Sequence, residues 1–216
     1  NCTGRICVTM FASNIGRILS IARAAKKVGR SVCMAGRSLR TYTAVADEYQ
    51  MLRDVGGMID PKRAASLPPN RVLYIVTGSQ GESRAVMARV ASGTFRDIRL
   101  SRGDTAIFSA RAIPGNERSI SAIKDLLYSA GVGVVDMRSN PLIHATGHPF
   151  REEISEMIDW VRPNILIPIQ GERLHLEAQA ELARSKQVPF TIVPENGSVI
   201  RLSDSGAHEI GRVPVG

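Results

Sequence analysis

The stretch that decides the fold is RVLYIVTGSQGE, residues 71–82. Residues 71–76 are almost continuously apolar, which predicts a central strand covered on both faces of a sheet. A loop with two glycines follows, and residues 83–91 then show a helical pattern. Such a loop between a strand and a helix presents unpaired backbone N–H groups to an anion. The stretch therefore predicts an α/β unit with a candidate ligand loop.

The same order of strand, loop and helix recurs on both sides of this stretch. Further strands are predicted at residues 5–10, 31–35, 104–109 and 131–136. Further helices are predicted from residue 15 to the stop at Gly29, with Asn14 or Ser13 as N-cap, and at 41–52 and 119–130. Residues 60–70 contain three prolines and predict a connector without regular structure. Strands that alternate with helices through short loops indicate a doubly wound, mostly parallel α/β sheet.

The character of the chain changes near residues 142–146. Pro149 is expected at the first position of a helix that ends before Pro163, and residues 165–169 predict a strand covered on both faces. His148 precedes this helix and Gln170 follows this strand, so one helix–strand unit would bring both to the same rim. A helix at 174–186 and strands at 190–193 and 197–202 complete a smaller α/β segment.

Composition favours a polyanionic partner without proving one. Lys and Arg number 28 against 20 Asp and Glu, so the formal charge is +8. Phosphate binding would explain this surplus, and a merely basic surface explains it equally well. Aromatic residues are only 5%, which argues against a binder built mainly on base stacking. Together these observations make a nucleic-acid partner an open hypothesis.

Cysteine usage and hydropathy bear on the compartment. The odd number of cysteines, in apolar surroundings, predicts reduced and buried thiols in a cytoplasmic protein, and they are Cys2, Cys7 and Cys33. No apolar run reaches 18 residues and no signal-peptide pattern opens the chain, so no membrane association is expected. The start at Asn1, without a methionine, suggests a piece of a larger protein.

Four loops carry the candidate phosphate contacts. Each follows a predicted strand, and they are residues 11–14, 36–38, 77–82 and 114–116. The loop 77–82 matches neither the GxxxxGK[ST] phosphate loop nor the GxGxxG fingerprint, and alone it could be a plain tight turn. Four such loops on one rim fit a phosphate-lined groove better than four independent turns.

Histidine spacing supplies no metal site. A lone His148 is more often a loop histidine than a ligand, and His144 four residues earlier adds little. His175 and His208 have no partners at ligand spacing, and the chain contains no HxHxDH cluster. A GxSxG elbow is absent as well, so no serine nucleophile is predicted.

In order, the motifs resemble those of ribonuclease J, a family of metallo-β-lactamase/β-CASP nucleases. The motifs are FASN at 11–14, GRS at 36–38, TGSQGE at 77–82, GDT at 103–105, IPGNE at 113–117, TGH at 146–148 and GE at 171–172. The resemblance implies a Rossmann-like β-CASP domain over residues 1–143. It implies that residues 144–216 are the C-terminal portion of the metallo-β-lactamase domain.

The resemblance also implies a function. Family members cleave RNA internally and in the 5′→3′ direction with two zinc ions, so zinc is expected in the full-length protein and none in this chain alone. A homo-oligomer, dimer or tetramer, is also expected. His148 matches the histidine that contacts the scissile phosphate, and Thr146 matches a phosphate-binding hydroxyl. RNA or phosphate contacts are expected at Ser13, Asn14, Arg37, Ser38, Thr77, Gly78, Ser79, Gln80, Gly81, Glu82 and Asn116.

Two departures from the family pattern keep other interpretations open. The upstream HxHxDH motif is absent, and Gln170 stands where the PxHGE motif has a zinc-binding histidine. A glutamine amide oxygen is a poor zinc ligand. The alternatives are a catalytically degenerate RNA-binding or regulatory subunit, and an unrelated nucleotide-binding α/β enzyme. The second lacks an acidic ribose partner, since Arg102 stands near the expected position.

Overall fold

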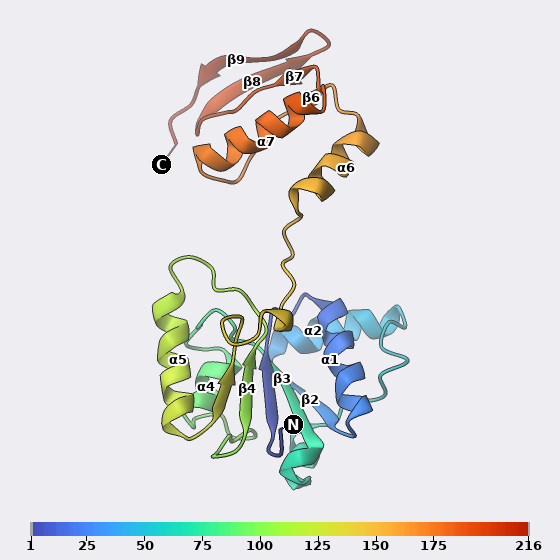
Figure 1. Cartoon of the computed structure of the whole chain (residues 1–216), viewed down its shortest axis with the longest axis vertical. Coiled ribbons are helices and arrows are strands. Elements are labelled where there is room, and N and C mark those ends of the chain that lie inside the picture. The colour runs from blue at the N-terminus through green and yellow to red at the C-terminus, as the bar shows by residue number, and fades with distance from the viewer. Residues whose placement is uncertain (1, 216) are drawn as a thin grey trace. The chain divides into compact units, whose positions relative to one another are not determined.

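The computed structural model describes residues 2–215 (Figure 1). The chain divides into two compact units, which we call unit 1, Asn1–Ala145, and unit 2, Thr146–Gly216. From sequence the domain boundary was expected between residues 143 and 144, and that assignment stays a prediction. Across residues 2–215, the helices are all too short or too polar to cross a membrane.

Unit 1 is built on a parallel sheet. Its five strands lie in the order β2-β3-β1-β4-β5, and they are β1 Ile6–Thr9, β2 Ser31–Ala35, β3 Val72–Val76, β4 Thr105–Phe108 and β5 Gly133–Val135. All of β3 is buried, and it lies between β2 and β1. The predicted central strand is therefore confirmed, and with it the doubly wound α/β fold.

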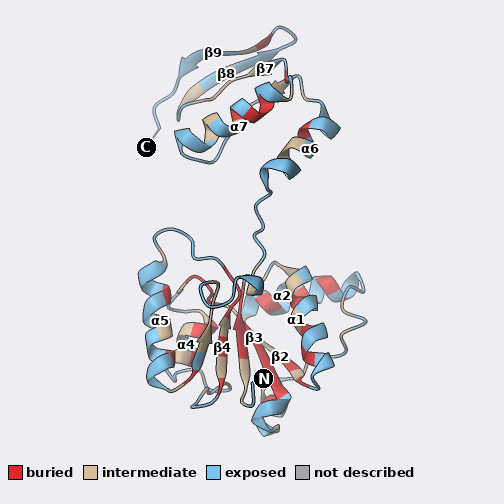
Figure 2. Cartoon of the chain, viewed as in Figure 1, coloured by how far each residue is buried: buried red, intermediate tan, exposed pale blue. Residues whose placement is uncertain are grey.

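Helices cover both faces of this sheet (Figures 1 and 2). The helices are α1 Ile15–Lys27, α2 Arg37–Glu48, α3 Pro61–Ser66, α4 Val86–Ala91 and α5 Glu117–Ser129. One core contains Ile18 of α1, Leu39 of α2 and Ile75 of β3. The other contains Tyr74 of β3 and Ile123 of α5. Alternate residues of β3 thus enter opposite cores, as the pleat of a strand requires.

The predicted N-cap of α1 is confirmed, because the Asn14 side chain accepts a hydrogen bond from the backbone N–H of Arg17 at 2.9 Å. The predicted helix at 41–52 is instead α2, which begins four residues earlier. Leu39, Thr43 and Ala46 face the core, and buried Thr43 satisfies its hydroxyl by donating to the Leu39 carbonyl at 2.7 Å. The helix itself is confirmed, but its start was predicted too late, because its first core residue, Leu39, stands alone among polar residues.

The predicted connector at 60–70 contains regular structure, so that prediction was wrong. Pro61 starts α3, and the Asp60 carboxylate caps it by accepting from the Arg63 N–H at 3.0 Å. A 3₁₀ helix, Pro69–Arg71, follows. Pro61 and Pro69 occupy first-turn positions, where a missing N–H costs nothing, and Pro68 is the N-cap of the 3₁₀ helix. In the helix predicted at 83–91, only Val86–Ala91 are helical.

Unit 2 contains helices α6 Arg151–Val161 and α7 Arg173–Ser185, and strands β6 Ile165–Leu166, β7 Phe190–Thr191, β8 Ser198–Ser203 and β9 Gly206–Arg212. Strands β6 and β7 pair in parallel, whereas β8 and β9 form an antiparallel hairpin. A small core joins Ile158 of α6 to Leu182 and Ala183 of α7. Unit 2 is the smaller α/β segment that the sequence predicted.

Three local predictions need correction. Pro149 lies outside α6, because Phe150 is the N-cap and its N–H is bound by the Glu153 carboxylate at 2.7 Å. The strand expected at 165–169 ends at Leu166, and Ile169 is 71% exposed rather than covered on both faces. Cys2 is exposed, whereas Cys7 and Cys33 are buried and free as predicted.

Candidate nucleic-acid interface

The four candidate loops lie along one edge of unit 1. They follow β1, β2, β3 and β4, and because these strands are parallel, their carboxyl ends share that edge. This is the edge where open α/β sheets bind ligands. The fold therefore brings Ser13, Arg37, Thr77 and Asn116 to one side of the sheet.

The loop 77–82 is held tightly against its neighbour. The buried Gln80 amide donates from Nε2 to the Arg111 carbonyl at 2.9 Å. Its Oε1 accepts from the Ile113 N–H at 2.9 Å and from Asn116 Nδ2 at 3.3 Å. Gln80 and Asn116 therefore connect the loops after β3 and β4, and their contact with RNA stays a prediction.

The two glycines of this loop allow a close approach to α4 and α5. Gly78 and Gly81 have φ of 109° and 83°, a region that residues with a Cβ rarely adopt. A Cβ on Gly81 would lie 2.6 Å from the Ser119 Cβ. Ser79 is also buried, and the Glu82 carboxylate accepts from the Gln80 N–H at 3.0 Å. In this structure these residues shape and hold the loop, and their contact with RNA stays a prediction.

Free polar groups remain on the other two loops. Arg37 and Ser38 are exposed at the start of α2, and within residues 2–215 their side chains form no hydrogen bond. Ser13 is exposed as well, whereas the Asn14 side chain is used as the cap of α1. Arg37, Ser38 and Ser13 are therefore available to a ligand.

Residues 143–145 are anchored to unit 1 by Ser109, which follows β4, and by Arg17 of α1. The Ser109 hydroxyl donates to the Ile143 carbonyl at 2.6 Å, and Arg17 donates to the carbonyls of Ser109 and Ala145 at 2.9 and 2.7 Å. Burial lowers the pKa of the Arg17 guanidinium. These two residues anchor the segment that leads to the TGH motif. Sequence reasoning missed them, because neither lies in a recognisable motif.

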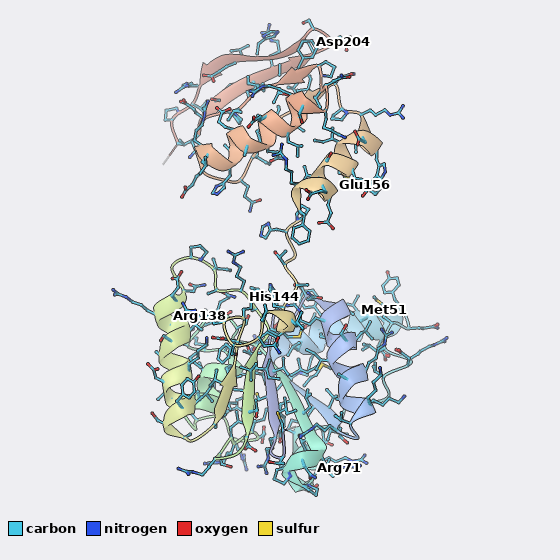
Figure 3. All side chains as sticks on the ribbon, in the orientation of Figure 1. Met51, Arg71, Arg138, His144, Glu156 and Asp204 are labelled. Carbon is cyan, nitrogen blue, oxygen red and sulfur yellow. The ribbon has the colours of Figure 1, made fainter. Side chains whose placement is uncertain are left out.

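His144 lies in this anchored segment, at the carboxyl edge of the sheet (Figure 3). Burial lowers its pKa from the ordinary value, and the nearby charges of Arg17 and Arg111 lower it further. Its Nδ1 atom is buried and has no hydrogen-bond partner in the described part of the chain. His144 is therefore held mainly as the neutral imidazole.

The three remaining candidates belong to unit 2. Thr146 and His148 are exposed, and the His148 N–H donates to the Thr146 hydroxyl at 3.2 Å, which shapes the TGH turn. Gln170 is exposed and has a left-handed backbone, with φ of 63°. Whether His148 and Gln170 share one rim, as the sequence suggested, stays a prediction.

The residues present do not fit a two-zinc centre. Within residues 2–215 no three His, Cys, Asp or Glu side chains gather closely enough to hold a metal ion. Gln170 offers only an amide, which binds zinc poorly.

Comparison with known proteins identifies two families along the chain. The model of the family "Ribonuclease J, beta-CASP domain" matches residues 3–127, and that of the "Zn-dependent metallo-hydrolase RNA specificity domain" matches residues 134–193. The chain belongs to the ribonuclease J family. Thr146, His148 and Gln170 lie in the part matched by the second model.

Individual members of the family match almost the whole chain. Ribonuclease J of Sinorhizobium meliloti is 39% identical over 213 residues, which is 99% of this chain and 38% of that protein. Ribonuclease J of Mycolicibacterium smegmatis is 37% identical over 99% of this chain and 38% of its own length. The Thermus thermophilus protein is 35% identical over 99% and 37%. This chain thus spans a little under two fifths of these relatives.

Proposed function

We propose that the intact protein is an RNA-processing ribonuclease that hydrolyses phosphodiester bonds both internally and from the 5′ end. The observation that carries this proposal is the similarity to ribonuclease J proteins over 99% of the chain. The charge of +8 and the polar loops on one sheet edge support an RNA ligand. This chain would supply the RNA-binding wall and part of the active site.

In this proposal the two units have different tasks. The exposed groups of unit 1, such as Arg37 and Ser38, bind the sugar–phosphate backbone without reading its sequence. In unit 2, His148 contacts the scissile phosphate and the Thr146 hydroxyl binds a phosphate oxygen. The hydrogen bond from the backbone N–H of His148 supports this, because it fixes the Thr146 hydroxyl beside His148 on one short turn.

The test is cleavage of a 5′-monophosphorylated RNA by the intact protein and two histidine variants. His148→Ala should lower kcat about 100-fold or more, the usual cost of removing a group that stabilises charge in a transition state. His208→Ala is the matched control. His208 is exposed on the β8–β9 hairpin, so its removal should leave kcat unchanged. Equal activity of both variants would contradict the role of His148.

Gln170 favours a second candidate function, a catalytically degenerate RNA-binding or regulatory subunit. Gln170 stands where the PxHGE motif of the family has a zinc-binding histidine, and an amide binds the metal more weakly than an imidazole. An intact protein that binds RNA but neither holds zinc nor cleaves would support this alternative.

We also propose that the intact protein carries zinc, forms a homo-oligomer and works in the cytoplasm. The name of the second matched family supports zinc, because it describes a Zn-dependent metallo-hydrolase domain. The buried free thiols of Cys7 and Cys33 support a reducing compartment. Elemental analysis and light scattering on the intact protein test the metal and the oligomer.

A further inference from the structure

A groove of about 680 Å³ opens at the carboxyl ends of β2 and β3. Met34 and Ala35 of β2 and Thr77 after β3 form its floor, α2 forms one wall, and the start of α4 with the following turn forms the other. Its volume lies within the range of pockets that take small ligands. The groove is thus formed by the folded elements of unit 1, and residues of two candidate loops line it.

The charge of the groove is strongly positive. Four guanidinium groups line it, those of Arg37, Arg40, Arg84 and Arg89, and Asp97 is the single carboxylate among its lining residues. Within residues 2–215 none of the four forms a salt bridge or a side-chain hydrogen bond, although Arg89 lies 5.0 Å from the centre of the Phe95 ring. Unpaired arginines converging on a groove favour an anion with several oxygens.

The other lining groups suit a nucleotide rather than a bare anion. The Tyr42 ring is 45% exposed and offers a stacking face for a base. The Ser38 hydroxyl offers a hydrogen bond to a sugar or phosphate, whereas the Thr41 hydroxyl already donates to the Arg37 carbonyl at 3.3 Å and can only accept. Stacking on an aromatic ring beside arginines is the usual arrangement for binding single strands without sequence preference.

The groove is separate from the place where residues 143–145 are anchored. That anchor lies at the carboxyl ends of β1 and β4, about two strand spacings or roughly 10 Å from β2 and β3. The RNA wall of unit 1 therefore extends beyond the anchor, along the sheet edge toward β2.

We propose that this groove binds one nucleotide of a single-stranded RNA, with its phosphate on the arginines and its base against Tyr42. The inference rests on the proposed function and adds a binding site to it. The same chemistry would also fit a free nucleotide. We assign the site to the strand because the groove shares one sheet edge with the exposed Ser13, which lies outside the lining and is also a candidate RNA contact.

The first test measures binding of a labelled ten-nucleotide RNA to the 216-residue chain. The double variant Arg84→Ala/Arg89→Ala should bind about tenfold more weakly or worse. Its salt dependence should be shallower by about 1.4, since each lost phosphate contact removes about 0.7. The control Lys27→Ala/Arg102→Ala removes the same charge at the amino ends of β2 and β4, and should keep the slope.

The second test addresses the base and does not depend on removing charge. Tyr42→Ala should weaken RNA binding about fivefold or more, and Tyr42→Phe should restore it because the ring remains. Equal binding by the wild-type chain and both double variants would overturn the groove and leave the proposed function intact. Absence of any RNA binding by the wild-type chain would overturn both. Binding of uridine 5′-monophosphate as tight as that of RNA would overturn the assignment to a strand.

Discussion

Single residues in the candidate interface divide into those that hold the loops and those that face a ligand. Gln80 belongs to the first group, because all its amide contacts are to the loop after β4. Arg37 and Ser38 belong to the second. The TGSQGE motif alone does not reveal this division, since the partners of Gln80 lie more than 30 positions away.

Gln80→Ala should destabilise unit 1 by about 1–3 kcal/mol, because it removes the hydrogen bonds that the buried Gln80 amide forms with the Arg111 carbonyl and the Ile113 N–H. Denaturant unfolding measures this loss. The control is Ser79→Ala, since Ser79 is equally buried and its hydroxyl forms no hydrogen bond within residues 2–215. Unchanged stability together with weaker RNA binding would instead mean that Gln80 contacts RNA directly.

Gln170 is the residue at which a single substitution separates the two candidate functions. In the intact protein, Gln170→His should raise zinc content and the rate of RNA cleavage, by about 10–100-fold if it behaves like other changes near a metal. An imidazole is a far better zinc ligand than an amide. Elemental analysis and cleavage of a 5′-monophosphate RNA provide independent readouts. Two tightly held zincs and full activity in the Gln170 protein would refute the degenerate site.

At the scale of elements, the sequence predicts those strands and helices whose own residues determine their structure. Strand β3 was predicted almost to its ends, because a short continuous run of apolar residues is typical of a strand buried on both faces. Helix α2 was predicted to begin four residues too late, because its first core residue, Leu39, stands alone among polar residues. The run 165–169 became a two-residue strand, because β6 has β7 as its single partner in the described chain and Pro168 lacks an N–H for a ladder.

The anchor of the 143–145 segment is an element-scale feature that can be tested. Arg17→Ala removes the donor to the Ala145 carbonyl, so the amides of residues 143–147 should exchange with solvent about 5–100-fold faster. Hydrogen–deuterium exchange measures the change. Arg23→Ala on the same helix is the control, since Arg23 pairs with Asp54 on an exposed surface. Equal protection in both variants would argue against the anchor.

At the scale of the whole molecule, the sheet edge could be predicted and its anchor could not. The parallel direction of the strands follows from alternating strands and helices, so four loops on one edge were predictable. The bond from Arg17 to the Ala145 carbonyl joins residues 128 positions apart, and the groove needs α2 and α4 to converge. No local pattern encodes either feature, because both arise only when the elements pack.

The whole chain should bind single-stranded RNA weakly and in a strongly salt-dependent way, and it should not cleave it. The charge of +8 and the unpaired arginines at the carboxyl edge of unit 1 motivate the binding. Four phosphate contacts would give a slope near −2.8 on a log–log scale, about a 50-fold loss of affinity between 50 and 200 mM salt.

Fluorescence anisotropy across that salt range measures the slope, and gel analysis of the same mixtures with added zinc measures cleavage. Inactivity is expected because, within residues 2–215, no three metal-binding side chains come together. An uncharged RNA analogue of equal length is the control, and it should bind far more weakly because it releases no counterions. Salt-independent binding would refute the phosphate-based interface, whereas zinc-dependent cleavage would place a complete active site within these 216 residues.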